Sequence, residues 1–115
     1  MATDPTCLFC RIVSGKVPAK IVYETPDVVA FRDINPQSPY HVVLVPRDHV
    51  ATLNDVEDAA VVGRLAVAAA MLAKQEGFAD RGYRTVINTN ADGGQTVFHL
   101  HLHLLAGRHH AWPPG

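Results

Sequence analysis

Three histidines near the end of the chain alternate with leucines in the stretch HLHLHLL, a spacing that can gather their side chains into a metal-binding or catalytic site. Side chains of an extended strand point alternately to opposite faces, so His99, His101 and His103 are expected to share one face. The leucines between them share the other face and can pack in a core. Each imidazole needs a hydrogen-bond partner, a metal or water.

Three interpretations of this histidine face compete. It can be a solvated polar surface, or a metal site whose rings converge across gaps of roughly 6.5–7 Å. It can also act on phosphorus: an uncharged imidazole attacks, while its neighbours donate hydrogen bonds to the phosphate oxygens and carry a proton to the leaving group. The strict alternation of three histidines makes the solvated surface the least favoured, because clustered titratable groups mark functional sites.

The polar turn before the histidines favours phosphorus chemistry. Gly93 and Gly94 let backbone N–H groups approach an anion closely. Gln95 and Thr96 follow with side-chain donors, and Asn88, at the end of the preceding strand, can point into the same pocket. A Gly-Gly turn alone most often only reverses a hairpin, and Asn88 alone is read as a strand terminator.

The chain has two cysteines, Cys7 and Cys10, in one C-x-x-C. In a reducing compartment this spacing indicates a metal or redox pair more than a structural disulfide. Two cysteines are half of a tetrahedral zinc site, which His49 and His99 can complete. The alternatives are two free thiols with His49 on the surface, or a redox pair. The redox pair is less favoured because nothing else resembles a thioredoxin unit.

Length and composition limit the possibilities further. A chain of 115 residues predicts one domain spanning 1–115. The net charge of −1 does not suggest a nucleic acid or an acidic membrane as a partner. No apolar run reaches the ~18 residues of a membrane span, and no signal peptide pattern is present, so we expect a cytoplasmic protein.

The elements that must position these residues follow from the hydrophobic pattern. We expect one short helix over residues 7–14, ending at Gly15, and strands over 20–24, 28–34, 41–45, 82–88 and 97–105. The segment TNADGGQ is expected to form a polar turn. Hairpins around one long helix predict an α+β fold with an antiparallel sheet.

The long helix is expected to begin at Asn54, with Glu57 as its capping-box partner, and to end at Gly77. Its sequence AAVVGRLAVAAAMLAKQ is apolar almost all round, which predicts burial on more than one side. We therefore expect a protein partner, most simply a second copy of the chain. The alternative is that alanine is only a good helix former and the outer face is exposed.

The residues HLHLHLL resemble the signature of the histidine triad superfamily. The stretches FRDINPQSPYHVVLVPRDHV and GYRTVINTNADGGQTVFHLHLHLLAGR, with the terminal WPPG, resemble its HINT branch, the purine nucleoside phosphoramidases. The resemblance implies a HIT-like fold with a five-stranded antiparallel sheet, one long helix and one short helix. It also implies an intertwined homodimer whose sheets join into ten strands.

The same resemblance implies a two-step reaction. His101 would attack the α-phosphorus of a purine nucleoside 5′-phosphoramidate or acyl-nucleotide, and water would then hydrolyse the nucleotidyl-histidine. His99 and His103 complete the triad, and Asn88, Thr96 and His103 would contact the phosphate or leaving group. The family more often has serine at the position of Thr96, which keeps the hydroxyl. The turn residues Gly94 and Gln95 are assigned to nucleotide binding with them.

For the nucleoside, the resemblance implies apolar contacts from Ile21, Phe31 and Ile34, and a ribose contact from Asp33. Without it, Phe31 and Ile34 would be read as core and Asp33 as a turn residue. Trp112 would reach the neighbouring subunit's site, although a frayed terminal residue is a competing interpretation.

Some members of the superfamily bind zinc through a C-x-x-C, a distant histidine and the first triad histidine, which here correspond to Cys7, Cys10, His49 and His99. Several relatives lack the cysteines, so the metal would order the N-terminal segment and not take part in the chemistry. Two other functions stay open: hydrolysis of dinucleoside polyphosphates on the same site, and a non-enzymatic nucleotide- or zinc-binding regulatory protein.

Overall fold

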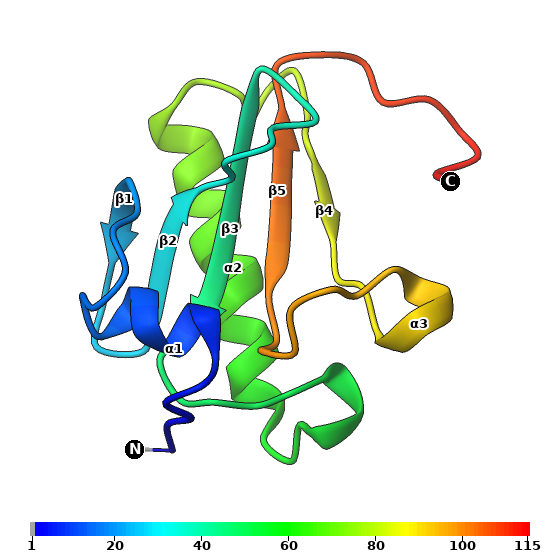
Figure 1. Ribbon diagram of the computed structural model, residues 1–115. Helices are drawn as coiled ribbons and strands as arrows, with labels where there is room; N and C mark the ends of the chain where they lie inside the picture. The colour runs from blue at the N-terminus through cyan, green and yellow to red at the C-terminus, as the bar shows by residue number, and fades with distance from the viewer. Residues whose placement is uncertain (1) are drawn as a thin grey trace.

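The computed structural model describes residues 2–115 and contains a five-stranded antiparallel sheet with strand order β1-β2-β3-β5-β4 (Figure 1). The strands are β1 (Ile21–Glu24), β2 (Val28–Arg32), β3 (Tyr40–Pro46), β4 (Arg84–Val86) and β5 (Leu102–Ala106). The helices are α1 (Leu8–Val13), α2 (Ala59–Gln75) and α3 (Asn90–Gly93), with a 3₁₀ turn η1 (Leu53–Asp55). The predicted α+β class and five-stranded antiparallel sheet are confirmed, with α3 and η1 as additional short elements.

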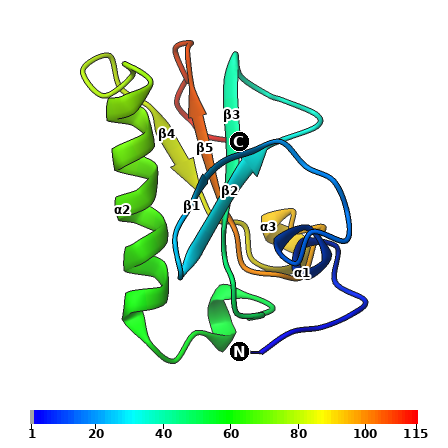
Figure 2. The ribbon, with the colours of Figure 1, turned by 90° about the vertical axis from the view of Figure 1, so that its left-hand side faces the viewer.

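Alternate side chains of the central strands build a core on each face of the sheet. Figure 2 shows α2 on one face, with α1 and α3 on the other. The core under α2 contains Val42, Leu44, Leu65, Leu72, Leu100, Leu102 and Leu104. The core under α1 contains Phe9, Ile12, Val29, Phe31, Val43 and Val45. Leu100, Leu102 and Leu104, which alternate with the histidines, therefore lie on the α2 face, which leaves the opposite face to the histidines.

Helix α2 begins later than the sequence predicts. Its N-cap is Asp58, whose carboxylate accepts a hydrogen bond from the N–H of Ala60 at 3.0 Å. Asn54 lies in η1, where Thr52 and Asp55 form a capping box of their own. Because Val56 then takes an extended conformation, the predicted pair of Asn54 and Glu57 does not cap the long helix.

Only one side of α2 is covered in this chain. Leu65, Ala69 and Leu72 are buried against the sheet, whereas Ala66, Val67 and Met71 are exposed. The expected burial on a second side is thus absent within the described chain, and the second copy that would supply it stays a prediction.

Four strands, β1, β2, β4 and β5, are shorter than predicted, β4 and β5 by the most, and one turn is helical. Strand β4 covers Arg84–Val86 and not 82–88, and β5 begins at Leu102 and not at 97. Residues 97–101 lack a neighbouring strand in the ladder; instead the N–H of Leu100 donates to the carbonyl oxygen of Val50 at 2.6 Å. The predicted polar turn contains α3, which ends at Gly94 with φ 80°, a left-handed conformation that favours glycine. No helix among residues 2–115 is long and apolar enough to cross a membrane.

Candidate active site

A cavity of about 650 Å³ opens on the α1 face of the sheet and is the size of a small-molecule site. Its apolar wall comes from α1, the segment after it, and the outward side of β2 and β3. Its polar side comes from β5, the segment around α3 and the loop between β2 and β3. The lining residues include Leu8, Phe9, Ile12, Phe31, Asp33, Ile34, His41, Val43, Asn88, Gly94, Thr96, His101 and His103.

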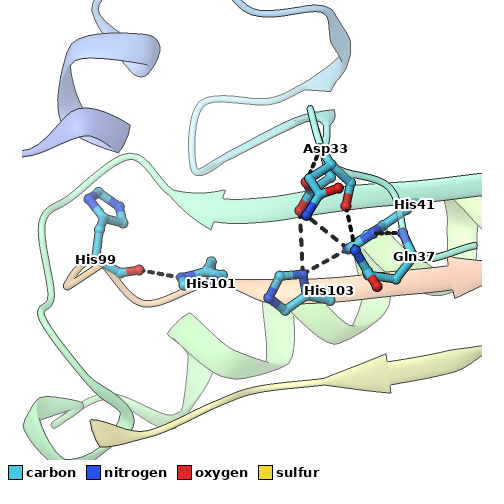
Figure 3. Close-up of polar contacts among 7 residues, drawn as sticks. Asp33, Gln37, His41, His99, His101 and His103 are labelled. Carbon is cyan, nitrogen blue, oxygen red and sulfur yellow. Dashed lines mark hydrogen bonds and ion pairs between the residues drawn. The ribbon is translucent and has the colours of Figure 1, made fainter. Parts of the chain in front are cut away.

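His101 is oriented by the backbone. Its Nδ1 lies 2.7 Å from the carbonyl oxygen of His99, and a carbonyl can only accept, so Nδ1 carries the proton (Figure 3). In the neutral ring Nε2 then keeps its lone pair. The ring of Phe9 packs edge-on against that of His101, with centroids 5.1 Å apart. His101 is thus a buried neutral imidazole at the cavity wall with one nitrogen available as a nucleophile.

His103 is held by a histidine on the neighbouring strand. The N–H of Gln37 donates to Nδ1 of His41 at 3.0 Å, so the proton of His41 sits on Nε2. That Nε2 lies 2.9 Å from Nδ1 of His103 and 3.4 Å from a carboxylate oxygen of Asp33 (Figure 3). His103 accepts this hydrogen bond at Nδ1, so its own proton is on Nε2, the nitrogen free to donate to a ligand.

Burial keeps the triad neutral. Desolvation lowers the pKa of His103 to about 4, with smaller contributions from His101 and His41, while Asp33 acts in the opposite direction. Desolvation also lowers the pKa of His101 and that of His41 below the usual histidine range. A neutral imidazole is the nucleophilic form, so the burial of these rings favours attack near pH 7.

The cavity brings together most of the residues that the sequence and the resemblance select. Phe31, Asp33, Ile34, Asn88, Gly94, Thr96, His101 and His103 all line it. Ile34 is fully exposed at the rim, and His99 lies behind the wall, completely buried.

Three expected nucleotide contacts lie outside the cavity wall. Ile21 is at the start of β1 and 41% exposed, and Trp112 is 82% exposed in the C-terminal segment. The side-chain amide of Gln95 donates to the carbonyl oxygens of Ala51 and Val97 and accepts from the N–H of Asn90. Gln95 therefore braces the loop that presents Gly94 and Thr96, and its side chain is already satisfied. The role of Trp112 in a neighbouring subunit stays a prediction.

Sequence reasoning missed His41 and the α1 wall. His41 begins the apolar run HVVLV, which has no alternation of polar and apolar residues, and only its shared face with Val43 in β3 places it at the cavity. Leu8, Phe9 and Ile12 sit in and beside the C-x-x-C and were read only as part of a short helix. Their contact with the β2 face depends on long-range packing that no local pattern reveals.

The expected metal ligands converge at the start of α1. The ligand atoms of Cys7, Cys10, His49 and His99 all lie within 4.8 Å of one another. Nδ1 of His99 is 3.4 Å from Sγ of Cys7 and 3.5 Å from Sγ of Cys10, and Nδ1 of His49 is 3.4 Å from Sγ of Cys10.

The donor chemistry of this cluster fits zinc. Nε2 of His99 donates to the carbonyl oxygen of Pro46 at 2.8 Å, which leaves a lone pair on the Nδ1 that faces the thiols. Two thiols and two imidazole nitrogens are a tetrahedral structural set.

A second group, Asp33, His41 and His103, also has ligand atoms close together. Its tautomers disfavour a metal. Nδ1 of His41 accepts from a backbone N–H, so its Nε2 is protonated and has no lone pair to give. This group is better described as a hydrogen-bonded relay leading to the cavity.

Comparison with known proteins places this site in context. Residues 14–110 match the HIT domain family. The purine nucleoside phosphoramidase of Escherichia coli K12 is 47% identical over 103 residues, which cover 88% of this chain and 87% of that protein. A 14 kDa zinc-binding protein of Brassica juncea is 46% identical over 112 residues, covering 94% of this chain and 98% of that protein.

A solved structure agrees with these sequence matches. The HIT family hydrolase from Legionella pneumophila Philadelphia 1 superposes with a TM-score of 0.93 and 48% identity, covering 96% of this chain and 100% of that one.

Proposed function

The chain belongs to the HIT domain family, and from this premise we propose that it hydrolyses purine nucleoside 5′-phosphoramidates and acyl-nucleotides through a covalent nucleotidyl-His101 intermediate. A hydrolase is supported by the similarity to a HIT family hydrolase of known structure. The phosphoramidate substrate is supported by the relative named as a purine nucleoside phosphoramidase.

The orientation of His101 is the observation that carries the proposal. Its Nδ1–H donates to the carbonyl of His99, so Nε2 is the available nucleophile beside a cavity of about 650 Å³. When Nε2 attacks phosphorus, positive charge develops on the ring. The carbonyl dipole that already accepts the Nδ1–H stabilises that charge without reorganising.

In the first step Nε2 of His101 forms a bond to the α-phosphorus, and the bond from phosphorus to the leaving nitrogen or oxygen breaks. For an amine leaving group, His103 first takes up a proton, and its Nε2 then gives a proton to the departing nitrogen; for a carboxylate leaving group, its Nε2–H donates a hydrogen bond to the departing oxygen. Water then attacks the phosphorus and gives its proton to Nε2 of His103 or to solvent, the bond to His101 breaks, and a nucleoside monophosphate is released. Thr96, Asn88 and the backbone of Gly94 line the cavity and supply donors to the phosphate oxygens.

His41 acts as a positioning residue in this scheme. By donating to Nδ1 of His103 across 2.9 Å, it selects the tautomer that presents Nε2–H to the ligand. Asp33, 3.4 Å from Nε2 of His41 and 3.9 Å from Nδ1 of His103, stabilises positive charge when His103 is transiently protonated.

The apolar wall is suited to a purine base. Phe31, Phe9 and Ile12 are buried side chains from two elements, with the rings of Phe9 and Phe31 packed edge-on at 5.3 Å. Asp33 is half-buried at the end of β2, and its carboxylate can accept hydrogen bonds from ribose hydroxyls in addition to the one from the N–H of Asn35.

We assign the cluster of Cys7, Cys10, His49 and His99 to structural zinc, as the similarity to a zinc-binding protein supports. Zinc there would tie the N-terminal segment to the residue that orients His101. The proposed reaction needs no metal step.

A homodimer is the proposed assembly. Strand β4 is an edge of the sheet, and its outer side has no neighbour among residues 2–115. Arg64, Val67 and Met71 lie on the flank of α2 that faces β1 and β2. At about 100° per residue, Ala59, Ala66 and Ala70 then lie on the flank toward β4. Small residues beside an open edge allow a second copy to approach closely.

The decisive test is His101→Asn, assayed with adenosine 5′-phosphoramidate and by AMP binding. Turnover should be abolished while AMP affinity changes little, because the asparagine cannot form the covalent intermediate. Hydrolysis at a normal rate in the variant would rule out His101 as the nucleophile. Faster turnover of diadenosine triphosphate by the native protein would favour a dinucleoside polyphosphate hydrolase, and tight AMP binding without any product would favour a regulatory protein.

A further inference from the structure

The C-x-x-C segment forms part of the cavity as well as the metal cluster. Phe9 stands between the two cysteines, is 7% exposed and lines the cavity. Its ring lies 5.1 Å from that of His101 and 5.3 Å from that of Phe31. A change in the backbone between Cys7 and Cys10 therefore moves a wall of the cavity.

His99 connects the same cluster to the proposed nucleophile. Its Nδ1 faces both thiols at 3.4 and 3.5 Å, while its carbonyl oxygen accepts the Nδ1–H of His101 at 2.7 Å. The thiols thus adjoin the cavity along two routes, through Phe9 and through His99.

The two thiols are close enough for a disulfide after a local rearrangement. Their Sγ atoms lie within 4.8 Å of each other, and the N–H of Cys10 points at Sγ of Cys7 at 3.4 Å. Cysteines three residues apart at the start of a helix have Cβ atoms about 5–6 Å apart, so a disulfide needs an approach of only an ångström or two. Cys7 is half-buried and Cys10 is buried, so an incoming reagent meets Cys7 first.

We propose that Cys7 and Cys10 form a reversible modification site at which a small-molecule disulfide produces an internal disulfide, expels the metal and weakens nucleotide binding. The nucleotide part of this proposal rests on the proposed function. Such a disulfide is transient in a reducing compartment and suits a sensor, in contrast to a structural cross-link.

The chemistry balances as thiol–disulfide exchange. The Cys7 thiolate attacks one sulfur of the reagent, forming a mixed disulfide and releasing one reagent thiolate. The Cys10 thiolate then attacks the Cys7 sulfur and releases the second. The protein dithiol loses two electrons to the reagent, whose two thiolates take up the protons. Zinc leaves because both of its sulfur ligands have been consumed.

The disulfide pulls both sulfurs away from His99 and changes the backbone on each side of Phe9. The aromatic wall is then displaced from His101 and Phe31. We expect AMP to bind about fivefold more weakly or worse, the lower end of typical coupling between two sites.

The test uses the full chain loaded with zinc and treated with oxidised glutathione. Intact mass should show the loss of two hydrogens, a chromogenic chelator should detect released zinc, and equilibrium dialysis should show weaker AMP binding. Dithiothreitol followed by zinc should restore the affinity. A stable glutathione adduct, or an internal disulfide with unchanged AMP affinity, would overturn the proposal.

Two variants separate the steps. His49→Gln removes one metal ligand and keeps both thiols, so it should oxidise faster than the native chain. Phe9→Leu should still form the disulfide and release zinc, but its AMP affinity should change less on oxidation, because the leucine has lost the edge-on contacts. If oxidation weakens AMP binding in Phe9→Leu as much as in the native chain, the coupling does not pass through Phe9. If the reduced, zinc-loaded chain does not bind AMP at all, the proposed function is wrong, and so is the coupling to nucleotide binding. Disulfide formation and zinc release are measured separately, by intact mass and by the chelator, and do not depend on AMP binding.

Discussion

His41 and His103 face each other across two neighbouring strands, with Nε2 of His41 2.9 Å from Nδ1 of His103. Because Nδ1 of His41 accepts from the N–H of Gln37, the bond between the two histidines has a fixed direction, from His41 to His103. The backbone of one loop thereby determines which nitrogen of His103 carries a proton.

This direction predicts the behaviour of two His41 variants. His41→Leu should lower kcat by about a hundredfold, the range of a misplaced general acid, with little change in KM. The loss should be larger for substrates with poorer leaving groups. His41→Gln, which can still donate to His103, should recover part of the rate. The exposed His109→Gln serves as the matched control, and a fall in AMP affinity as large as the fall in kcat would argue against a positioning role.

The pKa of His103, lowered by burial from 6.5 to about 4, predicts how stability depends on pH. Its folded-state pKa lies below the unfolded value, so the neutral ring contributes stability in full above pH 6.5, and this contribution is lost as the pH falls to about 4. The titratable groups that face this ring are Asp33, His41 and His101. The loss should be on the order of 2–3 kcal/mol.

Urea unfolding of the native chain and of His103→Gln, both with chelator present, measures this contribution. The difference between their unfolding free energies should change mainly between pH 6.5 and 4. A difference that is constant across this range would mean that His103 titrates normally in the folded protein.

The metal cluster predicts that protein purified without nickel contains about one zinc per chain. Removing the zinc should reduce hydrogen-exchange protection in α1 and leave that of β3 and β5 largely unchanged, because only the N-terminal segment depends on the ligands. Cys10→Ser should contain less zinc per chain than the native protein in the same assay. A zinc content well below one per chain in the native protein would reject the assignment.

The sequence predicts those parts of the site that depend on local periodicity. The alternation in HLHLHLL places leucines in one core and histidines on the other face, although β5 is regular only from Leu102. The antiparallel sheet also follows from local patterns. What could not be predicted depends on contacts distant in the chain: Phe9 against Phe31, His41 against His103, and Gln95 bonded to Ala51.

The start of the long helix could not be predicted either, although its local sequence contains a capping pattern. Asn54 and Glu57 match a capping box, but Thr52 and Asp55 form one two residues earlier, and Asp58 then caps α2. Several capping side chains within one short segment make the start of a helix ambiguous, and the tertiary position of the preceding turn decides between them.

Two variants test the proposed dimer, because each places an arginine on a different flank of α2. Ala66→Arg puts a long charged side chain on the flank toward β4 and should shift sedimentation from dimer to monomer. Val67→Arg puts the same side chain on the opposite flank, where Val67 is already 61% exposed, and should remain dimeric. If both variants stay dimeric, the interface lies elsewhere.

The hydroxyl of Thr96 is predicted to contact the reacting phosphate or the leaving group. Thr96 lines the cavity beside Gly94, on the loop that Gln95 braces. Thr96→Val keeps the shape and removes the hydroxyl, so kcat/KM should fall about tenfold or more, as expected for a lost hydrogen bond to a charged group. Thr96→Ser keeps the hydroxyl and should remain close to the native rate. Wild-type turnover in Thr96→Val, measured alongside Thr96→Ser on adenosine 5′-phosphoramidate, would show that this hydroxyl does not contact the charge that develops during the reaction.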